Sequence, residues 1–171
     1  MKTLIAVLIG LTIATVANAQ NREDLRSGTN TIKLLGGSVQ AASAFGLDYE
    51  RRTGSFGLGG KILHSTKNAD SGKSESTTLD VHAVSHLFDR SDMDVYIAGG
   101  IGVTNMDDVL DTTDNTTSDE TLVGPTLGIG VVYTLNPQWS LGFEYYTLYN
   151  WFSEKVSDNY NFANVALGFN F

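Results

Sequence analysis

A regular alternation of apolar with polar or small side chains constrains this chain more than any other feature. Residues 139–152 show it most clearly, because their side chains separate onto two faces with a period of two. That period predicts a β-strand with one apolar face. One face collects Trp139, Leu141, Phe143, Tyr145, Tyr149 and Trp151, and the other collects Ser140, Gly142, Glu144, Tyr146 and Asn150.

The same alternation recurs along the rest of the chain, and no convincing amphipathic helix interrupts it. The predicted strands fall near residues 32–34, 45–50, 56–62, 79–87, 95–104, 127–135, 139–152 and 162–171. Short connections near 52–54, 89–92 and 136–137 alternate with longer polar ones near 38–43, 66–75, 106–121 and 153–161. The first longer one is ambiguous, because residues 36–44 fit either a strand or a loop. An even strand number with this loop pattern predicts an all-β, eight-stranded antiparallel up-and-down barrel.

The direction of the apolar face separates two kinds of barrel. A soluble ligand-binding barrel turns its apolar face inward, whereas a transmembrane barrel turns it toward lipid and fills its interior with polar and small residues. Aromatic side chains near the strand ends favour the membrane barrel, because amphipathic rings settle at the headgroup level. The span from Trp139 to Trp151, at ~3.3 Å per residue and a tilt near 45°, rises roughly 28 Å, close to a bilayer core. The predicted interface aromatics are Tyr49, Tyr133, Trp139, Tyr149, Trp151 and Phe169.

The N-terminal segment has the pattern of a secretory signal peptide. Lys2 supplies the positive charge, an apolar stretch follows, and Ala17-Asn18-Ala19 places small residues where a signal peptidase cleaves. We therefore expect a cleaved signal peptide at residues 1–19, a short periplasmic tail at 20–30 and a barrel domain at 31–171. The apolar stretch is shorter than the ~20 residues that a membrane-spanning helix needs.

Composition excludes several classes of function. The formal net charge is −8, so binding to nucleic acid, which needs clustered cations, is not expected. The chain contains no cysteine, which excludes disulfides, thiolate nucleophiles and Cys-ligated metal sites. We expect neither a cofactor nor a bound metal.

The C-terminal strand carries a recognisable pattern. Its alternate positions hold Val165, Leu167, Phe169 and the terminal Phe171. This arrangement resembles the C-terminal targeting strand of Gram-negative outer-membrane proteins, which the barrel-assembly machinery reads. With the signal peptide and eight strands, the chain resembles the small outer-membrane barrels of the OmpX, Ail and OmpA-transmembrane type. The resemblance implies a monomer integral to the outer membrane, in contact with outer-membrane lipid and lipopolysaccharide, without the peptidoglycan-binding domain of full-length OmpA-type proteins.

Charged residues on the non-apolar face are predicted to form a polar network inside the barrel. An eight-stranded barrel is just wide enough for side chains to fill it, and unpaired buried charges are costly, so these groups must pair. Similar depths on neighbouring strands predict a contact between Lys33 and Asp48 or Glu50. A closed structural plug is expected, with a narrow or gated water path as the alternative. The predicted network comprises Lys33, Asp48, Glu50, Lys61, Asp80, His82 and Glu144.

Histidine and acidic residues supply the remaining candidates for chemistry. Some eight-stranded barrels modify lipid A acyl chains with Ser and His near the outer rim, but adjacent strand residues such as Ser85 and His86 point to opposite faces. We therefore expect no enzyme. The predicted loop at 106–121 is rich in acids without bases, which favours a solvated, like-charged segment over a calcium site, with divalent ions that bridge these acids to lipopolysaccharide phosphates as the alternative. Its acids are Asp107, Asp108, Asp111, Asp114, Asp119 and Glu120.

The sequence thus predicts a structural or surface-interaction barrel, in adhesion or envelope integrity, with an unidentified extracellular partner. A small channel for ions or small or hydrophobic solutes is the first alternative. A lipid A-modifying enzyme is the second.

Overall fold

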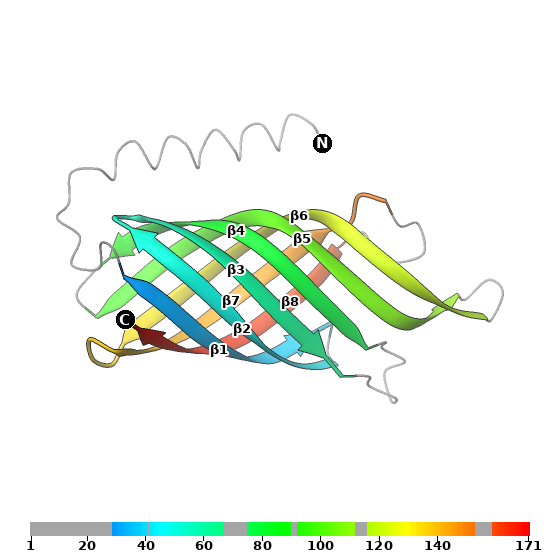
Figure 1. Ribbon diagram of the computed structural model, residues 1–171, viewed down its shortest axis with the longest axis horizontal. Helices are drawn as coiled ribbons and strands as arrows, with labels where there is room; N and C mark the ends of the chain where they lie inside the picture. Colours follow the sequence, from blue (N-terminus) through cyan, green and yellow to red (C-terminus); the bar gives the residue numbers. More distant parts are fainter. Residues whose placement is uncertain (1–28, 41, 67–74, 90–91, 112–115, 153–158) are drawn as a thin grey trace.

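The chain folds into a closed antiparallel barrel of eight strands, each paired with its neighbours in sequence order and β8 paired with β1 (Figure 1). The computed structural model describes residues 29–40, 42–66, 75–89, 92–111, 116–152 and 159–171. The predicted signal peptide, and the 20–30 tail as far as residue 28, lie outside these ranges. Within them, no helix is long and apolar enough to cross a membrane. The strands are β1 (Asn30–Val39), β2 (Ala42–Thr53), β3 (Phe56–Ser65), β4 (Ser76–Asp89), β5 (Met93–Asp111), β6 (Thr116–Thr134), β7 (Trp139–Tyr149) and β8 (Asn159–Asn170).

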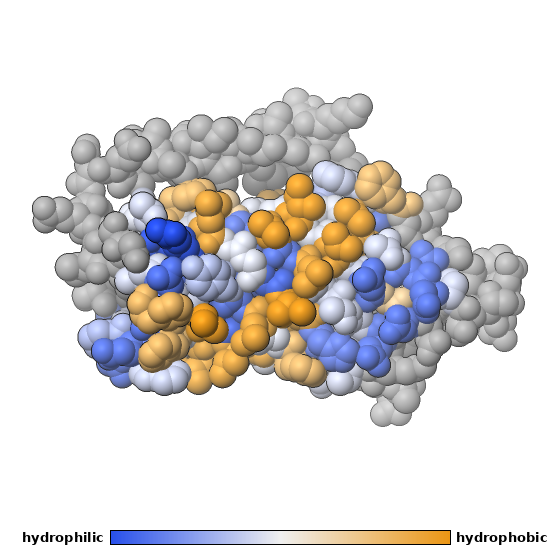
Figure 2. Space-filling view, viewed as in Figure 1, coloured by the Kyte–Doolittle hydropathy of each residue, from blue (hydrophilic) through white to orange (hydrophobic). Residues whose placement is uncertain are grey.

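Alternation sets the two faces of the barrel wall as the sequence predicted. On β7, Leu141, Phe143 and Tyr145 are exposed on the outside, while Ser140 and Glu144 are buried inside. A barrel whose outer face is this apolar is not stable in water. Figure 2 shows apolar side chains across the middle of one face, with hydrophilic side chains toward both ends.

Two connections differ from the sequence expectation. The connection expected near 38–43 is a tight turn, because β1 and β2 continue to the pair Val39–Ala42. Gln40 adopts a φ of 47° and donates from its backbone N–H to the Asn161 carbonyl, so β8 holds the turn. The small residues around Gly36 hide the alternation that would have identified the strands.

The segment expected as a loop at 106–121 is a hairpin. β5 and β6 pair as far as Asp111 and Thr116, whereas the pairing of β4 with β5 reaches only Ser76 and Met106. The hairpin therefore extends past its neighbours at the end of the barrel opposite the C-terminus (Figure 1). Apolar and polar residues do not alternate along this hairpin, because it extends beyond the apolar part of the outer wall.

Candidate functional site: the barrel interior and its outer rim

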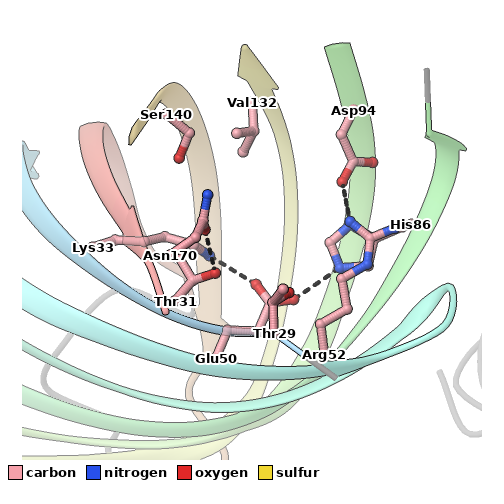
Figure 3. A pocket seen from close by; sticks show the side chains of 10 residues that line it. All are labelled: Thr29, Thr31, Lys33, Glu50, Arg52, His86, Asp94, Val132, Ser140 and Asn170. Carbon is pink, nitrogen blue, oxygen red and sulfur yellow. Dashed lines mark hydrogen bonds and ion pairs between the residues drawn. The ribbon is translucent and has the colours of Figure 1, made fainter. Parts of the chain in front are cut away.

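The end of the barrel nearest Thr29 and the C-terminus contains a chain of ion pairs. Lys33 Nζ lies 3.1 Å from Asp48 Oδ2 and 3.0 Å from Glu50 Oε2, so the predicted Lys33 contact is present with both carboxylates. His86 continues the chain, with Nε2 2.8 Å from Glu50 Oε1 and Nδ1 2.5 Å from Asp94 Oδ2 (Figure 3). Arg52 Nη1 closes it at 2.9 Å from Asp94 Oδ2. All these side chains are buried, so each charge depends on its partners rather than on water.

A second cluster forms around Glu144 at mid-height. Lys61 Nζ lies 2.5 Å from Glu144 Oε1, and its ammonium sits 3.4 Å from the centre of the Tyr146 ring. The Tyr96 hydroxyl donates to Glu144 Oε2 at 3.1 Å, and the Asn164 amide donates to Oε1 at 3.2 Å. Both oxygens of a fully buried carboxylate are thus satisfied, as a charge in a dry interior requires.

His82 lies between the two clusters, since its ring centre is 6.1 Å from that of Tyr146 and its Nε2 faces Asp48. Its Nδ1 lies 2.6 Å from Asp80 Oδ1, its Nε2 lies 3.5 Å from Asp48 Oδ1, and the Thr126 hydroxyl donates to Asp80 Oδ2 at 2.6 Å. The structure therefore places all seven network residues proposed from the sequence inside the barrel and brings them together.

Six further members of the two clusters were missed by sequence reasoning. Each occupies the inward parity of its strand, and this parity was the signal that could have found it. Arg52 lies within a predicted turn and Asp94 follows another, and the two tyrosines stand only on the less apolar face of their predicted strands. The six are Arg52, His86, Asp94, Tyr96, Tyr146 and Asn164.

The opposite half of the lumen is filled mainly by apolar side chains, contrary to the expected polar interior. This apolar plug consists of Leu35, Val39, Leu63, Leu122, Leu148 and Phe162, all nearly inaccessible. Hydroxyl pairs are set among them: Ser65 and Ser76 at 2.6 Å, and Thr78 and Thr104 at 2.8 Å. The strands narrow the lumen to side-chain width, so close packing excludes water here.

A small cavity lies at the charged end of the lumen. Its volume of about 30 Å³ is enough for one or two water molecules. Lys33, Glu50, Arg52 and His86 are among the residues around it (Figure 3). The ion-pair chain and the plug separate this cavity from the far end of the barrel.

The outer rim carries the remaining candidates. His64 lies on the outer face, with Nδ1 3.1 Å from the Thr77 hydroxyl and Nε2 3.4 Å from Glu75 Oε1. Ser65, its neighbour, points inward and contacts Ser76, so the two do not form a pair.

The acids expected in a loop instead lie on the hairpin strands. Asp107, Asp108 and Asp111 belong to β5 and Asp119 and Glu120 to β6, whereas Asp114 lies outside the described residues. In the described part of the chain, no group of three or more His, Asp or Glu residues is placed to hold a metal ion.

The aromatic and C-terminal positions lie on the outer surface. The six predicted interface aromatics are exposed, and the rings of Trp139 and Phe169 meet at 5.1 Å. Trp151 lies beyond the end of β7, although its backbone N–H donates to the Val123 carbonyl. Val165, Leu167 and Phe169 follow one another along the outer face of β8, and Phe171 pairs through its backbone with Asn30.

An apolar outer wall, rings near its edges and a packed charged lumen define a transmembrane β-barrel. The family model of the outer membrane protein β-barrel domain matches residues 3–171, and the chain belongs to this family. It is therefore an integral protein of the outer membrane.

Solved structures agree on the fold. The N-terminal barrel domain of Pseudomonas aeruginosa OprF has a TM-score of 0.67 at 14% identity, covering 85% of this chain and 98% of that one. Yersinia pestis Ail, also solved with the heparin analogue sucrose octasulfate, has a TM-score of 0.59 at 13% identity, and the match covers 85% of this chain and 99% of that one. A de novo designed transmembrane β-barrel has a TM-score of 0.57 at 17% identity, and the match covers 86% of this chain and 99% of that one. No curated protein sequence matches significantly. Because a designed barrel matches nearly as well as natural ones, the likeness carries the fold and not a function.

Proposed function

We propose that this protein is a monomeric, closed outer-membrane scaffold that presents its β5–β6 hairpin to an extracellular partner. The observation that carries this proposal is the hairpin itself, which extends beyond the strands beside it while the lumen below is filled. The segment 106–121 contributes six acids and no base. A surface of this charge suits a cationic partner, or lipopolysaccharide phosphates bridged by divalent ions, better than a sulfated polyanion.

The hairpin is tested by the adhesion of whole cells. Cells displaying the protein should bind amine-coated beads more than heparin-coated beads, and replacing residues 107–119 with a two-residue turn should abolish the difference. Asp107→Asn with Asp119→Asn and Glu120→Gln keeps the hairpin but removes charge, and should weaken attachment to amine beads alone. Unchanged attachment by the shortened variant, at equal surface level, would place the interaction elsewhere.

The filled lumen is tested by conductance. The mature protein in a planar bilayer should show no stable current, because an ion would have to cross both the ion-pair network and the apolar plug. Glu144→Gln and Lys61→Met should leave that silence unchanged, since the plug is intact in both. A steady current that responds to either substitution would favour the channel alternative.

Export and assembly complete the proposal. A signal peptide cleaved after Ala19 would deliver the chain to the periplasm, and Val165, Leu167, Phe169 and Phe171 would present the C-terminal strand to the barrel-assembly machinery. Exposed alternate apolar residues on β8 support this role. We propose no catalytic activity: His82 and His86 are held by carboxylates, and a lipid A-modifying reaction would have to use His64 with the Thr77 hydroxyl.

A further inference from the structure

The height of the apolar outer surface differs between opposite sides of the barrel. On β5, outward apolar residues continue from Met93 to Val103, ten residues along the strand. On β1, the exposed outward apolar side chains are Ile32 and Leu34, and Leu34 lies four residues from the strand start at Asn30. With a strand tilt near 40°, each residue rises about 2.5 Å, so the apolar surface reaches about 25 Å on β5 and about 10 Å on β1.

Polar side chains occupy the missing part of the surface. Ser38 lies on β1 eight residues from Asn30, the height at which β5 presents Ile101, eight residues from Met93. Ser43 on β2 pairs directly with Ser38, and on β7 and β8 the Thr147 hydroxyl donates to Asn161 Oδ1 at 2.9 Å. These four residues, Ser38, Ser43, Thr147 and Asn161, form what we call the polar notch.

The notch needs a polar environment from outside the protein. The hydroxyls of Ser38 and Ser43 have no hydrogen-bond partner among the described residues, and hydrocarbon cannot supply one. The notch is also continuous with the polar rim, where the Gln40 side chain donates to the Asn159 carbonyl. A surface open to the rim differs from a protein interface, which apolar residues would enclose.

We propose that lipid headgroups of the outer leaflet descend onto the polar notch, so that the bilayer is locally thin beside β8 and β1, between the taller apolar faces of β7 and β2. On the opposite side, β4 to β6 hold the leaflet at full thickness. Lipid adapts to such a mismatch at modest cost per ångström, whereas an unsatisfied hydroxyl in hydrocarbon is expensive. The barrel therefore carries a fixed lipid-thinning face.

The absence of cysteine from the sequence permits single spin labels without a background. Ser38→Cys and Ile101→Cys place labels at matched heights on opposite sides of the barrel, in vesicles of 16- to 18-carbon phosphatidylcholine. The Ser38 label should collide several-fold more often with a water-soluble nickel chelate than the Ile101 label does. The Ile101 label should collide more often with oxygen, which concentrates in the hydrocarbon. If both labels collide equally, and more with oxygen than with the nickel chelate, the proposal is overturned. So would a Ser38 label shielded from both reagents and broadened by spin coupling, which would indicate a second copy of the chain.

A second variant separates lipid thinning from simple barrel tilt. Ser43→Leu with Asn161→Leu makes the notch apolar and keeps the strand pairing. Added to Ser38→Cys, it should shift that label toward oxygen and away from the nickel chelate. Tilt alone would leave the label's access unchanged, and this result would also contradict the proposal. Far-ultraviolet circular dichroism and heat-dependent gel mobility confirm that each variant has folded.

Discussion

Glu144→Gln is expected to destabilise the barrel by about 3–5 kcal/mol, the range found when one partner of a buried ion pair is removed. The substitution preserves side-chain size but leaves the Lys61 ammonium, 2.5 Å from Glu144 Oε1, without its nearest counter-charge. It also weakens the acceptor for the Tyr96 hydroxyl and the Asn164 amide. The measurement is urea unfolding of the refolded protein in lipid vesicles, followed by tryptophan fluorescence.

The double variant Glu144→Gln with Lys61→Met isolates the charge. Removing both partners eliminates the unpaired ammonium, so the double variant should recover most of the lost stability. Asp119→Asn, a charge removal at an exposed hairpin position, should change stability by no more than about 0.5 kcal/mol. Equal losses in the double variant and in Glu144→Gln would show that the unpaired Lys61 ammonium is not the source of the lost stability.

The sequence was sufficient for the barrel because the membrane imposes the alternation. Most lipid-facing positions along β7 must be apolar and every inward one must fit the lumen, so a period of two remains visible in a single chain. The same rule identified Lys33, Asp48 and Glu50 as inward, and depth along adjacent strands predicted their contact.

Prediction failed where that constraint ends. Beyond the bilayer, β5 and β6 are held by backbone pairing, which any polar sequence can make, so the sequence of the hairpin predicts only a loop. The turn at Gln40 was obscured because Gly36 and Ser38 give the strand no apolar contrast. The apolar plug was missed because Leu35 and Leu63 follow the inward parity, where sequence reasoning expected polar groups. What fills a lumen depends on packing between strands distant in sequence, and periodicity does not report it.

The second large effect is expected at Gly130, on the inner face of β6. A Cβ added there would fall within the contact distance of the Tyr96 ring and hydroxyl, so the ring must move away from Glu144. Gly130→Ala should therefore destabilise the barrel by about 1–3 kcal/mol through overpacking, with loss of the Tyr96 hydrogen bond added to that. Urea unfolding in vesicles measures the first effect. The near-ultraviolet circular dichroism of the tyrosines reports the second.

Gly99→Ala, on the outer face of β5, is the matched control. The added Cβ would lie 3.7 Å from its nearest neighbour, Leu127 Cδ2, which is an ordinary van der Waals distance. This substitution should be neutral or slightly stabilising, since glycine weakens a strand interior. Tyr96→Leu removes the obstructing ring, and adding Gly130→Ala to it should cost far less than Gly130→Ala alone. That non-additivity is the signature of a steric clash between two residues in contact. If the losses from Gly130→Ala and Tyr96→Leu simply add, Gly130 does not make room for Tyr96. The backbone conformation of β6 would then be the reason for a glycine at this position.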